Sequence, residues 1–155
     1  MKKIVSLLIC VILLCGTALA EQTVFLPNSR YTLDLPDGMK YSMPEPEDNG
    51  MAAYTSAALE MDYVSYPKAD AVRQGMSETL RETAENLAAS GEEAELREVN
   101  GVLMLIFRMT DEADGASGIG YVFEDGDWII EINFWYATQE AADETERIIS
   151  SIKEK

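Results

Sequence analysis

Alternating apolar and polar residues predict that much of the chain forms β-strands. At 31–35, Tyr31, Leu33 and Leu35 alternate with polar residues, and the same period of two runs through 59–66. This is the pattern of a strand with one buried face. A shorter strand is expected at 51–56. The second half of the chain carries the longest such runs, which predict strands at 94–99, 102–110, 117–124 and 128–137.

Turn sequences between these strands predict that neighbouring strands run antiparallel. Asn100-Gly101 and Asp125-Gly126 are two-residue turns whose positions tolerate positive φ, as tight hairpins require. The connection at 111–116 is longer. The last four strands are therefore expected to form an antiparallel meander. Before them, the sequence PEPEDNG at 44–50 predicts an exposed loop.

Two segments have the spacing of amphipathic helices. Asp70 is expected to cap a helix that runs to about residue 90, with Gly91 as its C-terminal stop, and Thr138 is expected to cap a second one. Apolar residues recur every three or four positions in both, which places them on one helical face. The predicted inner faces are Val72, Met76, Leu80, Thr83 and Leu87 in the first helix and Ala141, Thr145, Ile148, Ile149 and Ile152 in the second.

The middle of the sheet is expected to be covered on both sides. Between Val102 and Met109, only Arg108 interrupts an apolar run, whereas a strand covered on one side alternates. One helix on each face would supply that cover. The predicted fold class is therefore α+β, an antiparallel meander flanked by two main helices in an α/β/α sandwich.

This order of elements resembles the PsbP-like α/β/α sandwich superfamily, as found in small secreted bacterial proteins. The resemblance is carried by the segment YTLDLPDG at 31–38, the VNGV hairpin at 99–102, the long sheet, and a last helix that ends in IISSI at 148–152. It covers nearly all of the chain after residue 20. The resemblance implies a binding or assembly protein of unassigned function, and it offers no catalytic motif to transfer.

Residues 1–20 have the three parts of a bacterial secretory signal peptide. Lys2 and Lys3 precede an apolar run, and the sequence ALA at 18–20 provides a cleavage site. Residues 21–155 are then expected to form a single domain outside the cytoplasm, secreted or in the cell envelope. Two alternatives remain open: an uncleaved membrane anchor, for which the apolar run is short, and lipidation of Cys15.

Composition excludes several classes of function. The chain has 12 basic and 28 acidic residues and no histidine, for a net charge of −16. Removal of residues 1–20 takes away both cysteines and two lysines, which leaves ten basic residues and a charge of −18. A His-dependent nucleophile and a Cys/His zinc site are therefore excluded. Such a polyanion is also expected to bind neither nucleic acid nor an anionic membrane.

One group of polar residues inside predicted strands is the best ligand-site candidate. Glu131, Asn133 and Trp135 share one face of the last strand, and Arg108 lies mid-strand two strands earlier. If all four face the same side, they form a polar patch with an aromatic platform. The alternative interpretation is a structural Arg–Glu pair.

Acidic loops suggest a weaker metal-site candidate. Asp111, Glu112 and Asp114 crowd the longer loop, and hard cations such as calcium need several oxygens around one point. The spacing does not match an EF-hand, so solvated acidic turns are the competing interpretation.

The sequence favours a monomeric, non-enzymatic binding or interaction module. No catalytic residue and no cofactor is assigned. The partner is an unidentified protein or small molecule, and the negative charge favours a cationic one. The alternatives are an acid-only hydrolase with paired carboxylates and an acidic calcium-binding protein.

Overall fold

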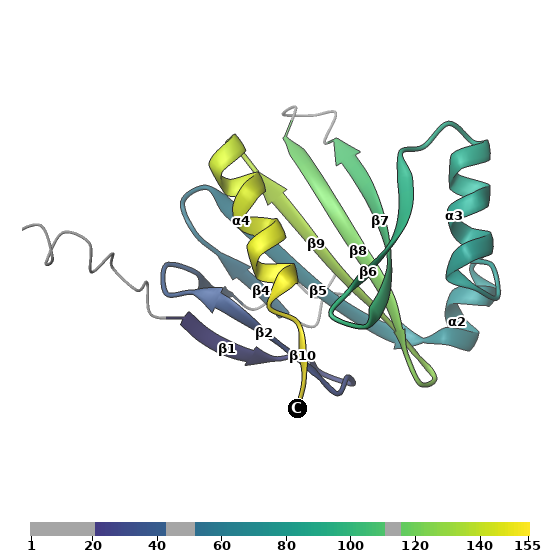
Figure 1. Ribbon diagram of the computed structural model, residues 1–155, viewed down its shortest axis with the longest axis horizontal. Coiled ribbons are helices and arrows are strands. Elements are labelled where there is room, and N and C mark those ends of the chain that lie inside the picture. The colour runs from purple at the N-terminus through teal and green to yellow at the C-terminus, as the bar shows by residue number, and fades with distance from the viewer. Residues whose placement is uncertain (1–20, 43–51, 111–115) are drawn as a thin grey trace, which may run out of the picture.

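The computed structural model describes residues 21–42, 52–110 and 116–155, whose arrangement is shown in Figure 1. Within these ranges, strands form a three-stranded sheet of order β1-β2-β10 and a seven-stranded sheet of order β3-β4-β5-β9-β8-β7-β6, both antiparallel. The strands are β1 Glu21–Phe25, β2 Tyr31–Pro36, β3 Lys40–Ser42, β4 Ala52–Thr55, β5 Leu59–Pro67, β6 Ala94–Val99, β7 Val102–Thr110, β8 Ser117–Asp125, β9 Trp128–Tyr136 and β10 Lys153–Glu154, and the helices are α2 Lys68–Arg73, α3 Leu80–Ala89 and α4 Gln139–Ser150. The predicted α+β class is confirmed, with three helices in the described ranges where two were expected.

The predicted meander is present as β6, β7, β8 and β9, which are neighbours in chain order. Asn100 and Gly101 close the first hairpin with φ of 49° and 81°, so both positions are left-handed as predicted. The second turn lies one residue later than predicted. Asp125 still pairs with Trp128, so the turn residues are Gly126 and Asp127, and Gly126 has a φ of 61°.

Three predicted features fall outside the described residues. They are the signal peptide at 1–20, the loop at 44–50 and most of the loop at 111–116. In the described part of the chain, no helix is long and apolar enough to cross a membrane.

Strand β5 lies beside β9 and connects the two halves of the chain. All nine of its residues pair with β9, from Leu59 opposite Tyr136 to Pro67 opposite Trp128. These strands are far apart in sequence, and neither turn chemistry nor periodicity predicts their contact. The pairing adds β4 and β3 to the edge of the meander and so builds the seven-stranded sheet.

Residues on β7, β8 and β9 are buried on both faces of the sheet. Because successive side chains on a strand point to opposite faces, Met104 and Ile106 lie on one face and Leu105 on the other. The first face packs with α4 and the small sheet, and the second with α2 and α3. The second cluster comprises Ala71, Leu80, Ala84, Leu105, Val122 and Ile129.

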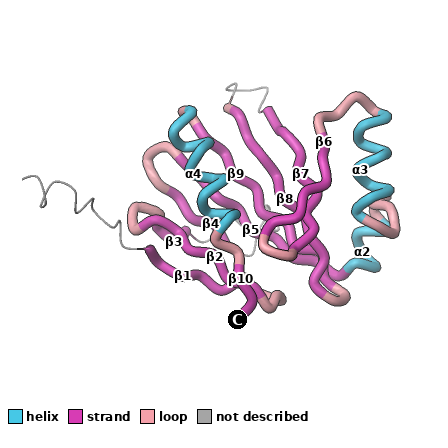
Figure 2. Tube along the Cα trace, in the orientation of Figure 1, coloured by secondary structure: helices cyan, strands magenta, loops and turns pink. Residues whose placement is uncertain are grey.

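The single helix predicted between 70 and 90 is wrong, because the segment forms two helices with a loop between them (Figure 2). Gly75 has a φ of 106°, a left-handed conformation that ends α2. Thr79 then starts α3, since its side chain accepts a hydrogen bond of 3.2 Å from the backbone N–H of Glu82.

The residues predicted for the inner face of that helix differ in their burial. Leu80 is buried and Met76 and Leu87 pack partly against the second cluster, but Val72 is exposed. Asp70 does not cap a helix, because α2 begins at Lys68 and Asp70 lies in its first turn. The second helix begins as predicted, since Thr138 caps α4 through the backbone N–H of Ala141. All five predicted inner residues are buried, but α4 ends at Ser150, so Ile152 lies after the helix.

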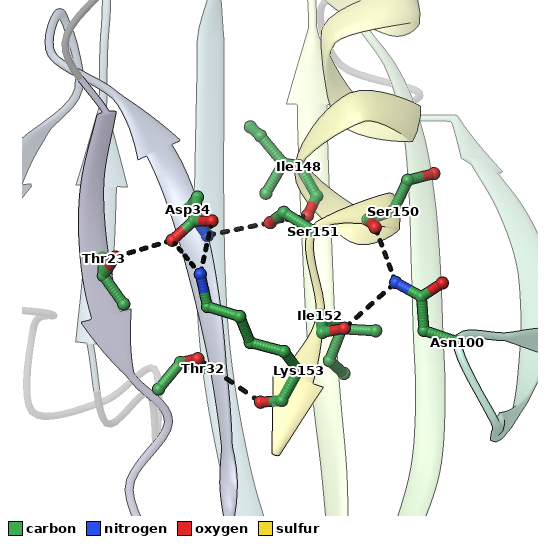
Figure 3. A network of polar contacts seen from close by, with 9 residues as sticks. All are labelled: Thr23, Thr32, Asp34, Asn100, Ile148, Ser150, Ser151, Ile152 and Lys153. Carbon is green, nitrogen blue, oxygen red and sulfur yellow. Dashed lines mark hydrogen bonds and ion pairs between the residues drawn. The ribbon is translucent and has the colours of Figure 1, made fainter. Parts of the chain in front are cut away.

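The short strands β1, β3 and β10 were not predicted from the sequence. Strand β10 follows α4 and pairs with β2, as β1 does on the other edge, so the C-terminal segment closes the small sheet. Figure 3 shows the polar network at this junction. Asp34 on β2 accepts hydrogen bonds from Lys153 Nζ at 2.8 Å and Thr23 Oγ1 at 2.6 Å, and its backbone N–H donates to Ser151 Oγ. One carboxylate thus joins all three strands of the small sheet.

The hydrogen bond from Lys153 and then that from Thr23 lower the pKa of Asp34 from its usual value of 3.8. Because the folded-state pKa is depressed, the carboxylate stabilises the fold above pH 3.8, and this contribution is lost as pH falls through the lower folded value. Asp34→Asn is therefore expected to destabilise the protein at pH 7 and to have a shrinking effect below about pH 4. Urea denaturation across this range measures it.

Asp37→Asn is the matched control, because Asp37 is exposed in the turn after β2. A stability difference between wild type and Asp34→Asn that stays constant down to acid pH would contradict the assignment.

Candidate functional site

The predicted candidate residues divide between the two faces of the sheet. Cross-strand partners in a ladder lie on the same face. Arg108 on β7 pairs with Ile119 on β8, and Ile119 pairs with Phe134 on β9. The side chains of Ile119 and Phe134 both belong to the cluster on the α4 side of the sheet. Glu131 pairs with Val122, which belongs to the cluster under α2 and α3. Glu131, Asn133 and Trp135 therefore share the α2/α3 side, and the expected patch does not include Arg108.

Arg108 lies instead at a groove between the β6–β7 edge and α4. Its Nε is 3.3 Å from Glu93 Oε2, and both side chains are mostly exposed. The groove has a volume of about 400 Å³ and also contains Arg97 and Glu146. Arg97 donates to both oxygens of Glu146, which also accepts from the buried Tyr121 hydroxyl at 3.0 Å. Both arginines of the groove are therefore already paired with carboxylates.

On the α2/α3 side, Glu131 is held by two hydrogen-bond donors. The Tyr66 hydroxyl donates to its Oε2 at 3.1 Å and Asn133 Nδ2 donates to its Oε1 at 2.9 Å. Burial, and then the charge of Glu131, raises the pKa of Tyr66, so the phenol remains a donor at neutral pH. The same network orients Asn133, whose Oδ1 is buried and has no hydrogen-bond partner among the described residues.

Trp135 and Phe107 lie over two glycines of β8. A Cβ atom added to Gly118 would be 2.8 Å from Cε3 of Trp135, and one added to Gly120 would meet the ring of Phe107. Glycine inside a strand marks a place where another group approaches the backbone closely. Here aromatic side chains from the neighbouring strands do so, and both rings remain partly exposed.

A cavity of about 670 Å³ opens beside Trp135, and we call it the Trp135 cavity. Its lining residues are Ser56, Ala57, Ala58, Leu59, Glu60, Asp62, Ala116, Ser117, Trp135, Tyr136 and Ala137. Glu60 pairs directly with Trp135 and Asp62 with Asn133, so all four side chains share one face.

Glu60 and Asp62 were not predicted as site residues. In the sequence they are the polar positions of an alternating strand, which are normally solvated. Their relevance depends on the pairing of β5 with β9, for which the sequence carries no local signal.

The metal candidates Asp111, Glu112 and Asp114 lie outside the described residues. Within the described ranges, no three Asp or Glu side chains are grouped so that they could hold a metal ion.

Comparison with known proteins shows the fold. The chain matches no family profile and no curated protein sequence. Among solved structures, it is similar to the solution structure of cyanobacterial PsbP (CyanoP) from Synechocystis sp. PCC 6803, with a TM-score of 0.56 and 13% identity over 91% of this chain and 97% of that one. It is also similar to a crystal structure from Bacteroides thetaiotaomicron VPI-5482, with a TM-score of 0.60 and 10% identity over 86% of this chain. The chain spans about half (48%) of the length of that Bacteroides protein.

The protein thus has a PsbP-like fold, as the resemblance in its sequence implied. Identities of 10% and 13% show the fold alone, and the function must be argued from the surface of this molecule.

Tyr66→Phe tests whether the Glu131 network is formed as described. The variant removes one hydrogen bond to a partly buried carboxylate while keeping the ring, and we expect it to lower the free energy of unfolding by about 1–2 kcal/mol. Urea denaturation at pH 7 measures this. Tyr41→Phe is the control, since Tyr41 is exposed on edge strand β3 and makes a ring contact with Tyr54. Equal effects of the two substitutions would show that the Tyr66 hydroxyl contributes nothing specific.

Proposed function

We propose that the protein is an exported, non-enzymatic binding module whose ligand site is the Trp135 cavity. One observation carries the proposal: the Trp135 ring lies close to a glycine of the sheet and remains partly exposed beside a cavity of about 670 Å³. Ligand sites combine such an apolar surface with a few convergent polar groups. Here the charged groups that line the cavity are Glu60 and Asp62.

The cover of the sheet explains why a site is available at this position. Helix α2 contacts β5 and β9, and α3 contacts β6 and β7 (Figure 1). Under these helices, Val122 and Ile129 are buried. Further along β9, Asn133 and Trp135 are partly exposed although they belong to the same face. Beyond the helices, β9 therefore changes from buried apolar residues to partly exposed ones. A ligand can reach this part of the face, which supports the proposed site.

Export rests on the signal-peptide pattern of residues 1–20, and it gives the module its location outside the cytoplasm or in the cell envelope. The α/β/α layering of the PsbP-like superfamily agrees with the helices on the two faces of the large sheet. In this arrangement the layers form the scaffold and the Trp135 cavity is the functional surface.

The test is NMR mapping with a panel of neutral, anionic and cationic probes: methyl glucoside, benzoate and N-acetyl-arginine amide. At least one probe is expected to shift the Trp135 indole N–H signal more than that of Trp128, at the other end of β9. Gly118→Ala should displace the Trp135 ring and weaken that binding about tenfold, at a stability cost of about 1–3 kcal/mol.

Gly38→Ala is the matched control, because a Cβ atom there has open space around it. The proposal fails if no probe shifts the Trp135 signal, or if both glycine variants bind equally well.

An acid-only hydrolase is the second candidate, because two carboxylates, Glu60 and Asp62, line the same cavity. Retaining glycosidases need two such groups about 5 Å apart. Nitrophenyl glycosides distinguish the candidates: a binding module leaves them intact. Hydrolysis by the wild type that is lost in both Glu60→Gln and Asp62→Asn would instead establish the enzyme.

A further inference from the structure

We propose that edge strand β6 joins two copies of this chain into a symmetric dimer, in which β6 pairs antiparallel with the same strand of the second copy. A dimer would replace the monomer that the sequence predicts. This surface is separate from the Trp135 cavity, and the inference does not depend on the proposed ligand site. It rests on the free backbone of β6, on the side chains that the pairing brings together, and on the position of α3.

The outer edge of β6 carries free backbone hydrogen-bonding groups. Strand β6 is the last strand of the seven-stranded sheet, with β7 as its one neighbour. The N–H of Arg108 donates to the carbonyl oxygen of Glu93, and bonded and non-bonded pairs alternate along an antiparallel ladder. Ala94, Leu96 and Glu98 therefore point their N–H and C=O groups away from β7, where they have no hydrogen bond to any described residue. Such an edge is a template for a further strand.

The side chains of β6 make the strand complementary to a second copy of itself. A two-fold axis at Leu96 places Leu96 opposite its own copy and Ala94 opposite Glu98 of the second copy, so all the outward backbone groups find partners. In this register Glu95 lies opposite Arg97 of the second copy, and Arg97 opposite its Glu95. Opposite charges in directly facing positions stabilise a strand pair. An axis at Glu95 or at Arg97 would instead place like charges opposite each other, so the charges select one register.

Both charged side chains are available for this contact. Arg97 donates to Glu146 through Nη2 only, and its Nη1 has no acceptor among the described residues. Its side chain is 39% exposed. Glu95 is exposed and makes no ion pair in the described part of the chain. Because a guanidinium has several N–H donors in one plane, Arg97 can bind Glu146 and Glu95 of the second copy together.

Helix α3 leaves the edge open for a second copy. Leu80 and Ala84 of α3 belong to the same buried cluster as Leu105 on β7 and Val122 on β8, so the helix lies over the sheet, inward of its edge. Neighbouring strands are about 4.8 Å apart, so a helix axis midway between β6 and β7 would lie about 10 Å from its copy across the two-fold axis. Helices pack at this spacing, and the two α3 helices can lie side by side.

The first experiment measures the dimer dissociation constant by sedimentation equilibrium at about 0.15 M salt, which screens the long-range repulsion between two acidic copies. Glu95→Arg places an arginine opposite Arg97 of the second copy at both symmetric positions, and it should raise the dissociation constant about 10- to 100-fold. Glu98→Arg is the matched control, because it changes the net charge equally on the same strand but lies opposite Ala94. It should change the dissociation constant less than about threefold. Melting curves establish that the three proteins are compared in the folded state.

Amide hydrogen exchange followed by NMR locates the interface. The N–H groups of Ala94, Leu96 and Glu98 should exchange slowly at protein concentrations far above the dissociation constant and quickly far below it. The N–H of Arg97 bonds to β7 in the monomer and in the dimer, so it serves as the internal reference.

Three results would overturn the proposed dimer. The first is a wild-type protein that remains monomeric at millimolar concentration. The second is a dimer in which the amides of Ala94, Leu96 and Glu98 stay unprotected, because it would use another surface. The third is an equal effect of Glu95→Arg and Glu98→Arg, because the charge pairing would then contribute nothing.

Discussion

The structure depends on the burial of strands β7, β8 and β9 on both faces. A strand that is apolar in every position needs cover on two sides, and this requirement places α4 with the small sheet on one face and α2 with α3 on the other. Only part of β9 needs this cover on the side of α2 and α3. Ile129 is buried under the helices, whereas the partly exposed Glu131, Asn133 and Trp135 follow on the same face. The candidate site begins where the apolar pattern of this face stops.

Glycine at positions 118 and 120 converts this uncovered face into a shaped surface. In most sheets, side chains on the central strand would stand up and fill the space. Here the bare backbone of β8 leaves space that the rings of Trp135 and Phe107 occupy from the two neighbouring strands. Adding a single methyl group at Gly118 would force the Trp135 ring away, because the sheet backbone itself cannot move without breaking its ladders.

Local patterns were sufficient to predict the elements of the meander, and they failed where distant strands meet. The hairpin at Asn100-Gly101 and the cap at Thr138 each depend on a few adjacent residues. The face on which Arg108 lies could also have been predicted. The connections from β7 to β8 and from β8 to β9 each contain an even number of residues, and this places Arg108 on the face of the sheet opposite Glu131. The pairing of β5 with β9, and with it the role of Glu60 and Asp62, has no such local origin.

The ion pairs show how the acidic and basic residues of the chain are distributed over the structure. Several of its few cations stabilise other parts of the fold: Lys153 bonds to Asp34 in the small sheet, Arg97 to Glu146 across the α4 groove, and Lys68 to Glu124 beside α2. Each of these pairs neutralises an acid at a junction between elements. The sequences of β5, β8 and β9 contain no Lys or Arg, so the acids of these strands depend on cations from other elements, as Glu124 depends on Lys68 and Asp125 on Arg30. The few cations of the chain therefore connect the sheet to the elements around it, and the remaining negative charge lies mostly on exposed residues, where water and salt screen it.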